Sequence, residues 1–379
     1  MNALKLRELL LLILFASLSA AVEEAKALEQ AGCIGQATEK TWYLGVYVAT
    51  DDSFRSCSPY KGQVLEEYLK AFLGGVGLYF QDMKSPTLQI VYLGSRNLTS
   101  GEERNVIGSV KSVTETAVKG GDAIKHIMDI PLTSDEHEII PGNKLLLVLT
   151  RLNITEEETK NSANHVAPHP ASSESDQDSD YDDSGEESMP LARAAFEKKP
   201  PKNVGGISEY GSICFMSGAI VQDSGSNFSG VAAAAKEIAN VLGPMYNGTI
   251  NRRVCSEDDP GMNNYHGNQC GAMKNSEYDE VKFECLKDEI SGTKDEVMTP
   301  FEFYKKHTGW TPCGTSYTGT EECKDLKTPS YPHESCNIAC CINQSLKFLN
   351  LMHYNIQAPD GADCESKKIC IGGKCVVAN

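Results

Sequence analysis

The sequence lacks any apolar run of the length that a membrane-spanning helix needs, which is about 18 to 20 residues. Basic residues are also scarce: 35 lysines and arginines stand against 52 aspartates and glutamates, a formal net charge of −17. A surface of this sign repels phosphate groups, so nucleic acids and anionic membranes are poor partners. The composition therefore predicts a chain with no membrane span and no affinity for nucleic acid.

The first 20 residues have the pattern of a secretion signal. Positively charged residues come first, an apolar stretch follows from Leu9 to Leu18, and small residues end the segment. The apolar stretch is too short to span a bilayer. We therefore predict a secreted, extracellular protein in which residues 1–20 are the signal and residues 21–40 form a polar N-terminal tail.

Cysteines and glycosylation sequons both fit an extracellular chain. The 14 cysteines suggest up to seven disulfides, concentrated in the C-terminal third. Cys33 is expected to pair with Cys57, and the close trio Cys336, Cys340 and Cys341 is expected to form disulfides rather than a metal site. Glycosylation is predicted at the five Asn-x-Ser/Thr sequons, which are Asn97, Asn153, Asn227, Asn247 and Asn343.

Apolar periodicity predicts alternating strands and helices in the N-terminal half. Strands are expected at 42–48, 88–93 and 144–150, and the last is apolar throughout, as in a strand buried on both faces. Helical spacing covers 64–83 and 110–129, despite three glycines in the first of these. The alternation predicts an α/β fold with a mixed, largely parallel sheet and long helices. A chain of 379 residues is too long for one small core, so a second domain is expected.

The stretch 229–248 is the most informative part of the sequence. It is rich in alanine, the best helix former, and Gly243 stands where a helix commonly ends. Lys236 and Asn240 are four residues apart and therefore share a helix face. A turn at Gly243 would bring Tyr246 towards the same face.

This spacing resembles the zinc helix of the metzincin metalloproteases, H-E-x-x-H-x-x-G-x-x-H. Glu237 and Gly243 match that motif, but Lys236, Asn240 and Tyr246 replace all three zinc-binding histidines. An ammonium, a neutral amide and a phenol are poor zinc ligands, and deprotonating a lysine at pH 7 costs about 4 kcal/mol. The resemblance implies zinc as cofactor, yet these residues predict that no metal is bound. Glu237 would then be a remnant of the family's general base, with no zinc-bound water to activate.

Further segments extend the resemblance to the reprolysin, or ADAM-like, branch of the metzincins. Residues 204–221 resemble the strand at the edge of the substrate cleft, and Met273 stands where the family has its methionine turn. Residues 281–290 resemble the last helix of the domain. For this helix the resemblance implies a disulfide between Cys214 and Cys285.

The C-terminal end resembles the tail of the cysteine-rich domain that follows reprolysin catalytic domains, through Asp-Gly-x-x-Cys within 359–376. The expected organisation is a metzincin-like domain at 41–291 and a small disulfide-rich domain at 292–379, with a connector at 292–310. Within the branch, the resemblance is to the reprolysin-like proteins that ticks secrete in saliva.

An acidic insertion is expected at residues 165–190. Its central part, 172–188, holds eight acidic residues and no basic one, so it is predicted to be disordered. Tyr181 lies among carboxylates, a setting that favours tyrosine sulfation in a secreted chain. Such a segment suits a basic groove on an extracellular protein partner, with binding that is fast and weakened by salt.

Three functions are compatible with these features. The favoured one is a secreted reprolysin-like protein that is catalytically inactive and binds extracellular proteins. The alternatives are an active zinc metalloendopeptidase and a structural or decoy glycoprotein, and the sequence does not identify a partner or an oligomeric state. Two fates are expected for Lys236: its ammonium replaces the lost cation, bonded to Asn240 beside Glu237, or it extends into water.

Overall fold

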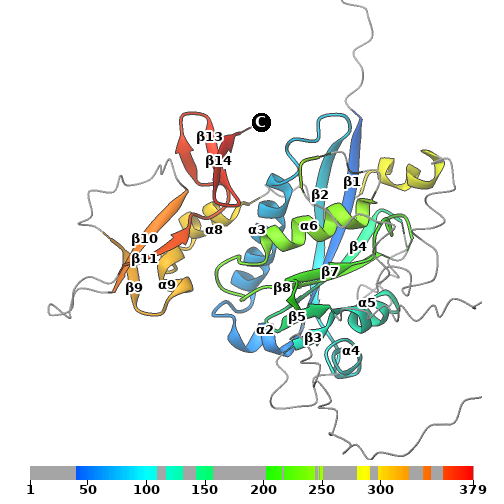
Figure 1. Ribbon diagram of the computed structural model, residues 1–379, viewed down its shortest axis with the longest axis horizontal. Coiled ribbons are helices and arrows are strands. Elements are labelled where there is room, and N and C mark those ends of the chain that lie inside the picture. The colour runs from blue at the N-terminus through cyan, green and yellow to red at the C-terminus, as the bar shows by residue number, and fades with distance from the viewer. Residues whose placement is uncertain are drawn as a thin grey trace, which may run out of the picture.

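The structure of the chain is a computed structural model that describes residues 40–108, 117–130, 142–156, 202–215, 217–243, 246, 248–250, 280–290, 298–323, 336–342 and 353–378. In Figure 1 a sheet flanked by helices lies beside a smaller, strand-rich C-terminal region, drawn in orange and red. Several predicted features lie outside the described residues, namely the signal at 1–20, the tail up to residue 39, Cys33, the insertion 165–190 with Tyr181, Asn247, Met273 and Asn343.

A five-stranded sheet organises the N-terminal part of the chain. Its strands are β1 (Thr41–Thr50), β2 (Thr87–Asn97), β4 (Lys144–Thr150), β7 (Gly206–Ser208) and β8 (Ser217–Gln222). The order is β2-β1-β4-β8-β7, in which the first four strands run parallel and β7 is antiparallel at one edge. The strands predicted at 42–48, 88–93 and 144–150 are confirmed, and so is a mixed, largely parallel α/β sheet.

Helices cover both faces of this sheet (Figure 1). In the described ranges these helices are α2 (Asp52–Cys57), α3 (Gln63–Leu78), α4 (Ser100–Val106), α5 (Gly120–Met128) and α6 (Val231–Leu242). Leu145, Leu147 and Leu149 of β4 belong to the core with α3 and α6, whereas Leu146 and Val148 belong to the core with α4 and α5. Both faces of β4 are therefore buried, which is why its sequence is continuously apolar.

The helix predicted at 110–129 is wrong in its first half, so far as that half is described. Residues Ala117–Lys119 form strand β3, which pairs in a small sheet with β5 (Asn153–Glu156), itself paired with β6 (Lys202–Asn203). Val118 lies opposite Ile154, and both side chains are buried. Pairing with a distant strand overrides the local helical spacing until α5 begins at Gly120.

The edge segment predicted at 204–221 is a hairpin of two strands, of which only β7 lies at the edge. Cys214 lies in the connection between them and forms the expected disulfide with Cys285, at a Cα–Cα distance of 5.8 Å. Cys285 belongs to the helical segment predicted near 281–290, here a 3₁₀ helix, η3 (Glu280–Lys287).

The C-terminal region consists of short elements joined by disulfides. These elements are α8 (Pro300–Lys306), α9 (Pro312–Ser316), β9 (Thr320–Glu322), β10 (Asn337–Ile342), β11 (His353–Gln357), β12 (Asp363–Glu365), β13 (Lys368–Ile371) and β14 (Lys374–Val377). The strands form two antiparallel sheets, β11-β10-β9 and β12-β13-β14. The disulfides are Cys313–Cys340, Cys323–Cys341, Cys336–Cys370 and Cys364–Cys375. Cys336, Cys340 and Cys341 are thus all disulfide-bonded, as predicted.

The connector predicted at 292–310 contains helix α8, which packs against α3. Thr299 and Glu302 form a capping box at its start. Pro300 lies so close to α3 that a Cβ on Gly75 would stand 2.8 Å from its Cγ. The segment is therefore part of a packed interface, and a domain boundary near 292 stays a prediction. None of the helices in the described ranges has the length and apolar character that crossing a bilayer requires.

Candidate functional site

Helix α6 ends where the sequence predicted, at Leu242 with Gly243 as its C-cap residue. This glycine has a φ of +58°, and a Cβ there would lie 2.6 Å from the Cα of Gly211. Only glycine meets both demands without strain, because it tolerates positive φ and has no side chain. Gly243 therefore fixes where the helix stops and lets the helix end lie directly against Gly211.

The start of α6 is anchored by Asp223, which is fully buried. Its carboxylate accepts hydrogen bonds from the backbone N–H groups of Gly230 and Gly225, both at 2.7 Å, and from the Tyr68 hydroxyl at 2.7 Å. Burial raises the pKa of Asp223, and these three donors act against that rise. The loop before α6 is therefore tied to helix α3 through a buried polar network.

Edge strand β7 covers two of the residues aligned with the zinc motif. Glu237 and Asn240 are each only 1% exposed. Asn240 Nδ2 donates to Ser208 Oγ at 3.0 Å, and Ser208 Oγ donates in turn to Glu237 Oε2 at 2.7 Å. Gly206 permits this close approach, because a Cβ there would stand 2.9 Å from Glu237 Cγ. Glu237 and Asn240 are thus both hydrogen-bonded to Ser208 of the sheet, a partner that the motif itself does not indicate.

Lys236 does not take the place of a cation beside these residues. Within the described chain its ammonium makes no hydrogen bond or ion pair with Asn240 or Glu237, and Asn240 Oδ1 has no hydrogen-bond partner. The expected bond between Lys236 and Asn240 is therefore wrong. The physical reason is that β7 draws the Asn240 amide towards Ser208, whereas Lys236 is only half-buried.

Tyr246, at the third motif position, packs in the apolar core. It is 3% exposed and lies edge-to-face against Phe80, with ring centroids 5.7 Å apart. Its hydroxyl accepts a hydrogen bond from the Ile250 backbone N–H at 2.7 Å. This donor set does not fit zinc, because a phenol and a neutral amide oxygen are poor zinc ligands and Lys236 carries an ammonium with no lone pair. We derive no metal-dependent step from these residues.

Three of the predicted glycosylation sites lie in the described chain, and they differ in exposure. Asn97 and Asn153 are exposed, at the end of β2 and the start of β5. Asn227 is half-buried in the loop before α6, and its Nδ2 lies 3.4 Å from Ser316 Oγ of α9. Use of any of these sites stays a prediction.

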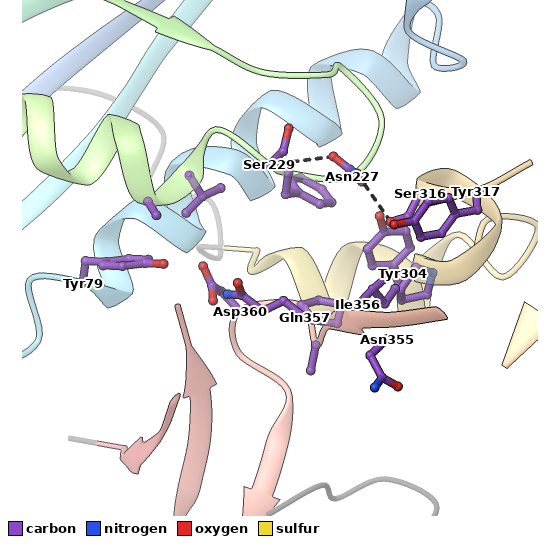
Figure 2. A pocket seen from close by; sticks show the side chains of 16 residues that line it. Tyr79, Asn227, Ser229, Tyr304, Ser316, Tyr317, Asn355, Ile356, Gln357 and Asp360 are labelled. Carbon is purple, nitrogen blue, oxygen red and sulfur yellow. Dashed lines mark hydrogen bonds between the residues drawn. The ribbon is translucent and has the colours of Figure 1, made fainter. Parts of the chain in front are cut away.

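A cavity of about 420 Å³ lies between the start of α6 and the C-terminal region, as Figure 2 shows. Sequence reasoning missed it, because its two walls come from segments far apart in the chain. Asp360 forms one end, and Gly372 N–H donates to its Oδ1 at 2.8 Å. Burial raises the pKa of Asp360 to about 6. The Tyr79 hydroxyl faces this carboxyl in Figure 2 but is not in hydrogen-bond geometry with it.

Comparisons with known proteins give little beyond this geometry. No profile of a known protein family matches the chain, and no curated protein matches it. Among solved structures, a chain from a chaperone–substrate complex aligns at 9% identity and a TM-score of 0.29, covering 56% of this chain and 25% of its own. Metalloproteinase-II from Bacteroides fragilis aligns at 10% identity and a TM-score of 0.30, covering 59% of this chain and 53% of its own. Likenesses of this size establish neither a family nor an activity.

Proposed function

We propose that this chain is a secreted, reprolysin-like protein that has no peptidase activity and acts by binding an extracellular protein. The strongest support is that Ser208 of β7 covers Glu237 and Asn240. Its Oγ lies 2.7 Å from Glu237 Oε2 and 3.0 Å from Asn240 Nδ2, and hydrogen bonds link all three side chains. A general base must reach a water or substrate proton within about 3 Å. A carboxylate that is 1% exposed and already bonded to a serine is poorly placed for that task.

The chemistry at the other motif positions supports the same proposal. Catalytic zinc usually has three protein ligands and one open position. Lys236, Asn240 and Tyr246 provide no imidazole, thiolate or carboxylate among them. Without zinc, the pKa of a bound water stays far above 7, as in bulk water, and no nucleophile forms at neutral pH.

The binding surface that we propose is the acidic segment 172–188, which lies outside the described residues. Its eight carboxylates, with sulfation of Tyr181, suit a basic groove on an extracellular partner. Deletion of 172–188 should weaken binding to a basic plasma protein and flatten its salt dependence. If both quantities are unchanged by the deletion, a structural or decoy glycoprotein is the better description.

The decisive experiment measures zinc and peptidase activity in the purified, dialysed protein. We expect no stoichiometric zinc and no activity. One equivalent of zinc that resists dialysis would establish the alternative, an active zinc metalloendopeptidase. Lys236→His alone should restore nothing, because two positions still lack a ligand.

The triple variant Lys236→His, Asn240→His, Tyr246→His tests the resemblance to the zinc helix itself. We expect it to bind no zinc, since position 240 is covered by Ser208 and position 246 is packed against Phe80. Tight zinc binding by this variant would show that the three positions still converge and that only the ligands have been lost.

A further inference from the structure

The wall of the cavity contains a complete glycosylation sequon. Asn227, Phe228 and Ser229 all line the cavity on the side of the loop before α6. The opposite wall belongs to the C-terminal region and includes Ser316 and Tyr317, together with Asn355 and Gln357 (Figure 2). The sequon thus faces a hollow that the chain itself builds from a distant segment.

The loop holds the Asn227 side chain in one orientation. Its Oδ1 accepts hydrogen bonds from Ser224 Oγ at 2.6 Å and from the Ser229 backbone N–H at 3.2 Å. The amide oxygen is therefore held within the loop. The amide nitrogen, to which a glycan is attached, points across to Ser316 (Figure 2).

Phe228, the middle residue of the sequon, has an unusual backbone conformation. Its φ is +60°, which costs of order 1–3 kcal/mol in a residue with a side chain and persists only where surrounding contacts impose it. Those contacts are a stack on the Tyr68 ring at 4.2 Å and a hydrogen bond from its N–H to the Tyr68 hydroxyl at 3.0 Å. Contacts with α3 thus hold the loop in the conformation in which Asn227 faces the cavity.

We propose that the N-linked glycan of Asn227 is held inside this cavity, with its first sugar bridging the start of α6 and the C-terminal region. The inference rests on the proposed secretion, because the glycan is added in the secretory pathway. The attachment precedes closure of the cavity, since the residues of the opposite wall follow Asn227 in the chain.

The lining matches the chemistry of a neutral sugar. Amide and hydroxyl groups of Ser316, Asn355 and Gln357 can both donate to and accept from sugar hydroxyl and acetamido groups. The exposed ring of Tyr317, stacked on Tyr354 at 4.9 Å, provides an aromatic surface for the apolar face of a pyranose. Among its described residues, the lining has no basic side chain and a single acidic one, Asp360, so it does not suit an anion. The volume, about 420 Å³, lies within the range of small-ligand sites.

The covalent step is carried out by the cell's transferase with a lipid-linked oligosaccharide diphosphate as donor. Asn227 Nδ2 forms a bond to C1 of the first sugar, the bond from C1 to the diphosphate oxygen breaks, and one Nδ2 proton is lost. The remaining N–H can still donate to Ser316 Oγ. No oxidation or reduction occurs.

Native deglycosylation of the full chain, secreted from a eukaryotic host, tests the proposal. Mass spectrometry of glycopeptides first establishes which asparagines carry sugar. We expect peptide-N-glycosidase to release the Asn227 glycan at least about ten-fold more slowly than those of the exposed Asn97 and Asn153, a difference of about 1.4 kcal/mol. After denaturation the three sites should be released alike.

Each remaining outcome overturns something specific. This inference is wrong if Asn97 and Asn153 carry sugar but Asn227 does not, or if native release is equal at all three sites. Either result leaves the proposed secretion standing. Absence of sugar at all three also overturns this inference. Failure of the full chain to reach the culture medium overturns the proposed secretion, and the inference with it.

Variants of the opposite wall test whether the cavity gives the protection. Gln357→Ala combined with Tyr317→Ala enlarges the cavity without touching the sequon. We expect native release at Asn227 to rise several-fold in this variant, while release at Asn97 stays the same. Unchanged release at Asn227 would show that the wall does not hold the glycan. Ser229→Thr, which keeps the sequon, serves as the matched control and should leave the protection intact.

Discussion

The two regions of this molecule are stabilised in different ways. The sheet-centred region buries apolar side chains on both faces of its strands, in two large clusters. In the C-terminal region, the buried cluster consists mainly of disulfide-bonded cysteines, with Ile338, Ala358 and Ala362 as its buried apolar members. Among the described residues, the small region buries few apolar side chains and is joined by covalent cross-links, whereas the larger one depends on the hydrophobic effect.

The interface between the regions is formed by aromatic packing, directly beside a buried polar network of the sheet-centred region. Phe303 of α8 meets the rings of Tyr68 and Phe228 edge-on, at 5.8 Å and 5.4 Å. The Tyr68 hydroxyl also donates to Asp223. The chain has two tryptophans, Trp42 in β1 and Trp310 after α8. Trp42 reports on the sheet, whereas Trp310 meets the Tyr60 ring edge-on at 5.1 Å and reports on the C-terminal region together with its contact to the sheet-centred one. Replacing one tryptophan at a time by phenylalanine lets the unfolding of each region be followed separately.

The largest expected effect comes from a disulfide of the C-terminal region. Removing Cys336–Cys370, which is buried and closes a loop with a sequence separation of 34, should destabilise that region by about 4 kcal/mol. Denaturation followed by Trp310 should shift, and that followed by Trp42 should shift much less. Cys364–Cys375, with a separation of 11, is the matched control and should cost about 3 kcal/mol. Equal shifts at both tryptophans would show that the regions unfold as one unit.

The next effect concerns the apolar core of the sheet. Leu147 in β4 is fully buried in the core with α3 and α6. Leu147→Ala should cost about 3 kcal/mol, because it removes buried methyl groups and leaves a cavity. The unfolding transition reported by Trp42 should shift to lower denaturant concentration before the one reported by Trp310. Leu147→Met, which nearly conserves volume, should cost less than about 1.5 kcal/mol, and a similar loss in both variants would contradict a packing explanation.

A smaller effect is expected where the regions meet. Tyr68→Phe keeps the ring but removes the hydroxyl that donates to Asp223 and accepts from the Phe228 N–H. We expect a loss of about 2 kcal/mol, since two buried groups lose a partner. Tyr60→Phe, which removes the hydrogen bond that the Tyr60 hydroxyl donates to the Ser226 carbonyl, should cost about 1 kcal/mol. If Tyr68→Phe shifts only the Trp42 transition, the polar network does not couple the regions.

The smallest effect depends on pH. The pKa of Asp360 is raised by burial from 3.8 to about 6, so the folded protein favours the neutral acid. The resulting stabilisation is full below pH 3.8 and is lost as pH rises through about 6. Asp360→Asn, whose amide oxygen can still accept from Gly372, should therefore be more stable than the parent at pH 7.5.

The same comparison at low pH completes this test. At pH 3.5 the two proteins should be equally stable, because both side chains are then neutral. Chemical denaturation at the two pH values, followed by Trp310, measures the difference. A stability difference that is the same at both pH values would show that titration of Asp360 is not its cause.

Local pattern was sufficient for the principal elements. The apolar run at 144–150 is a strand buried on both faces, and the alanine-rich stretch is a helix that ends at Gly243. These features depend on interactions within a few residues, so the sequence determined them by itself. It also located the Cys214–Cys285 disulfide, through a resemblance rather than through local pattern.

The candidate site depended on partners that only the tertiary structure provides. The positions of Lys236 and Asn240 predicted a shared helix face, but not that Ser208 would cover Asn240 or that Phe80 would pack on Tyr246. Those partners lie about 30 to 170 residues away in the sequence, and no local period encodes them.

The glycines show the division between local and tertiary information most clearly. In the sequence, Gly75 only weakens a helix and Gly206 only interrupts a strand pattern. In the structure, Gly75 allows Pro300 of α8 to approach α3, and Gly206 allows β7 to close over Glu237. Helix and strand were determined by the sequence, because backbone propensity and apolar period act locally. The contacts between helices and strands were decided by the tertiary structure, because close approach depends on which distant segments lie side by side. The same holds for the covered residues Glu237 and Asn240 and for the cavity at Asn227.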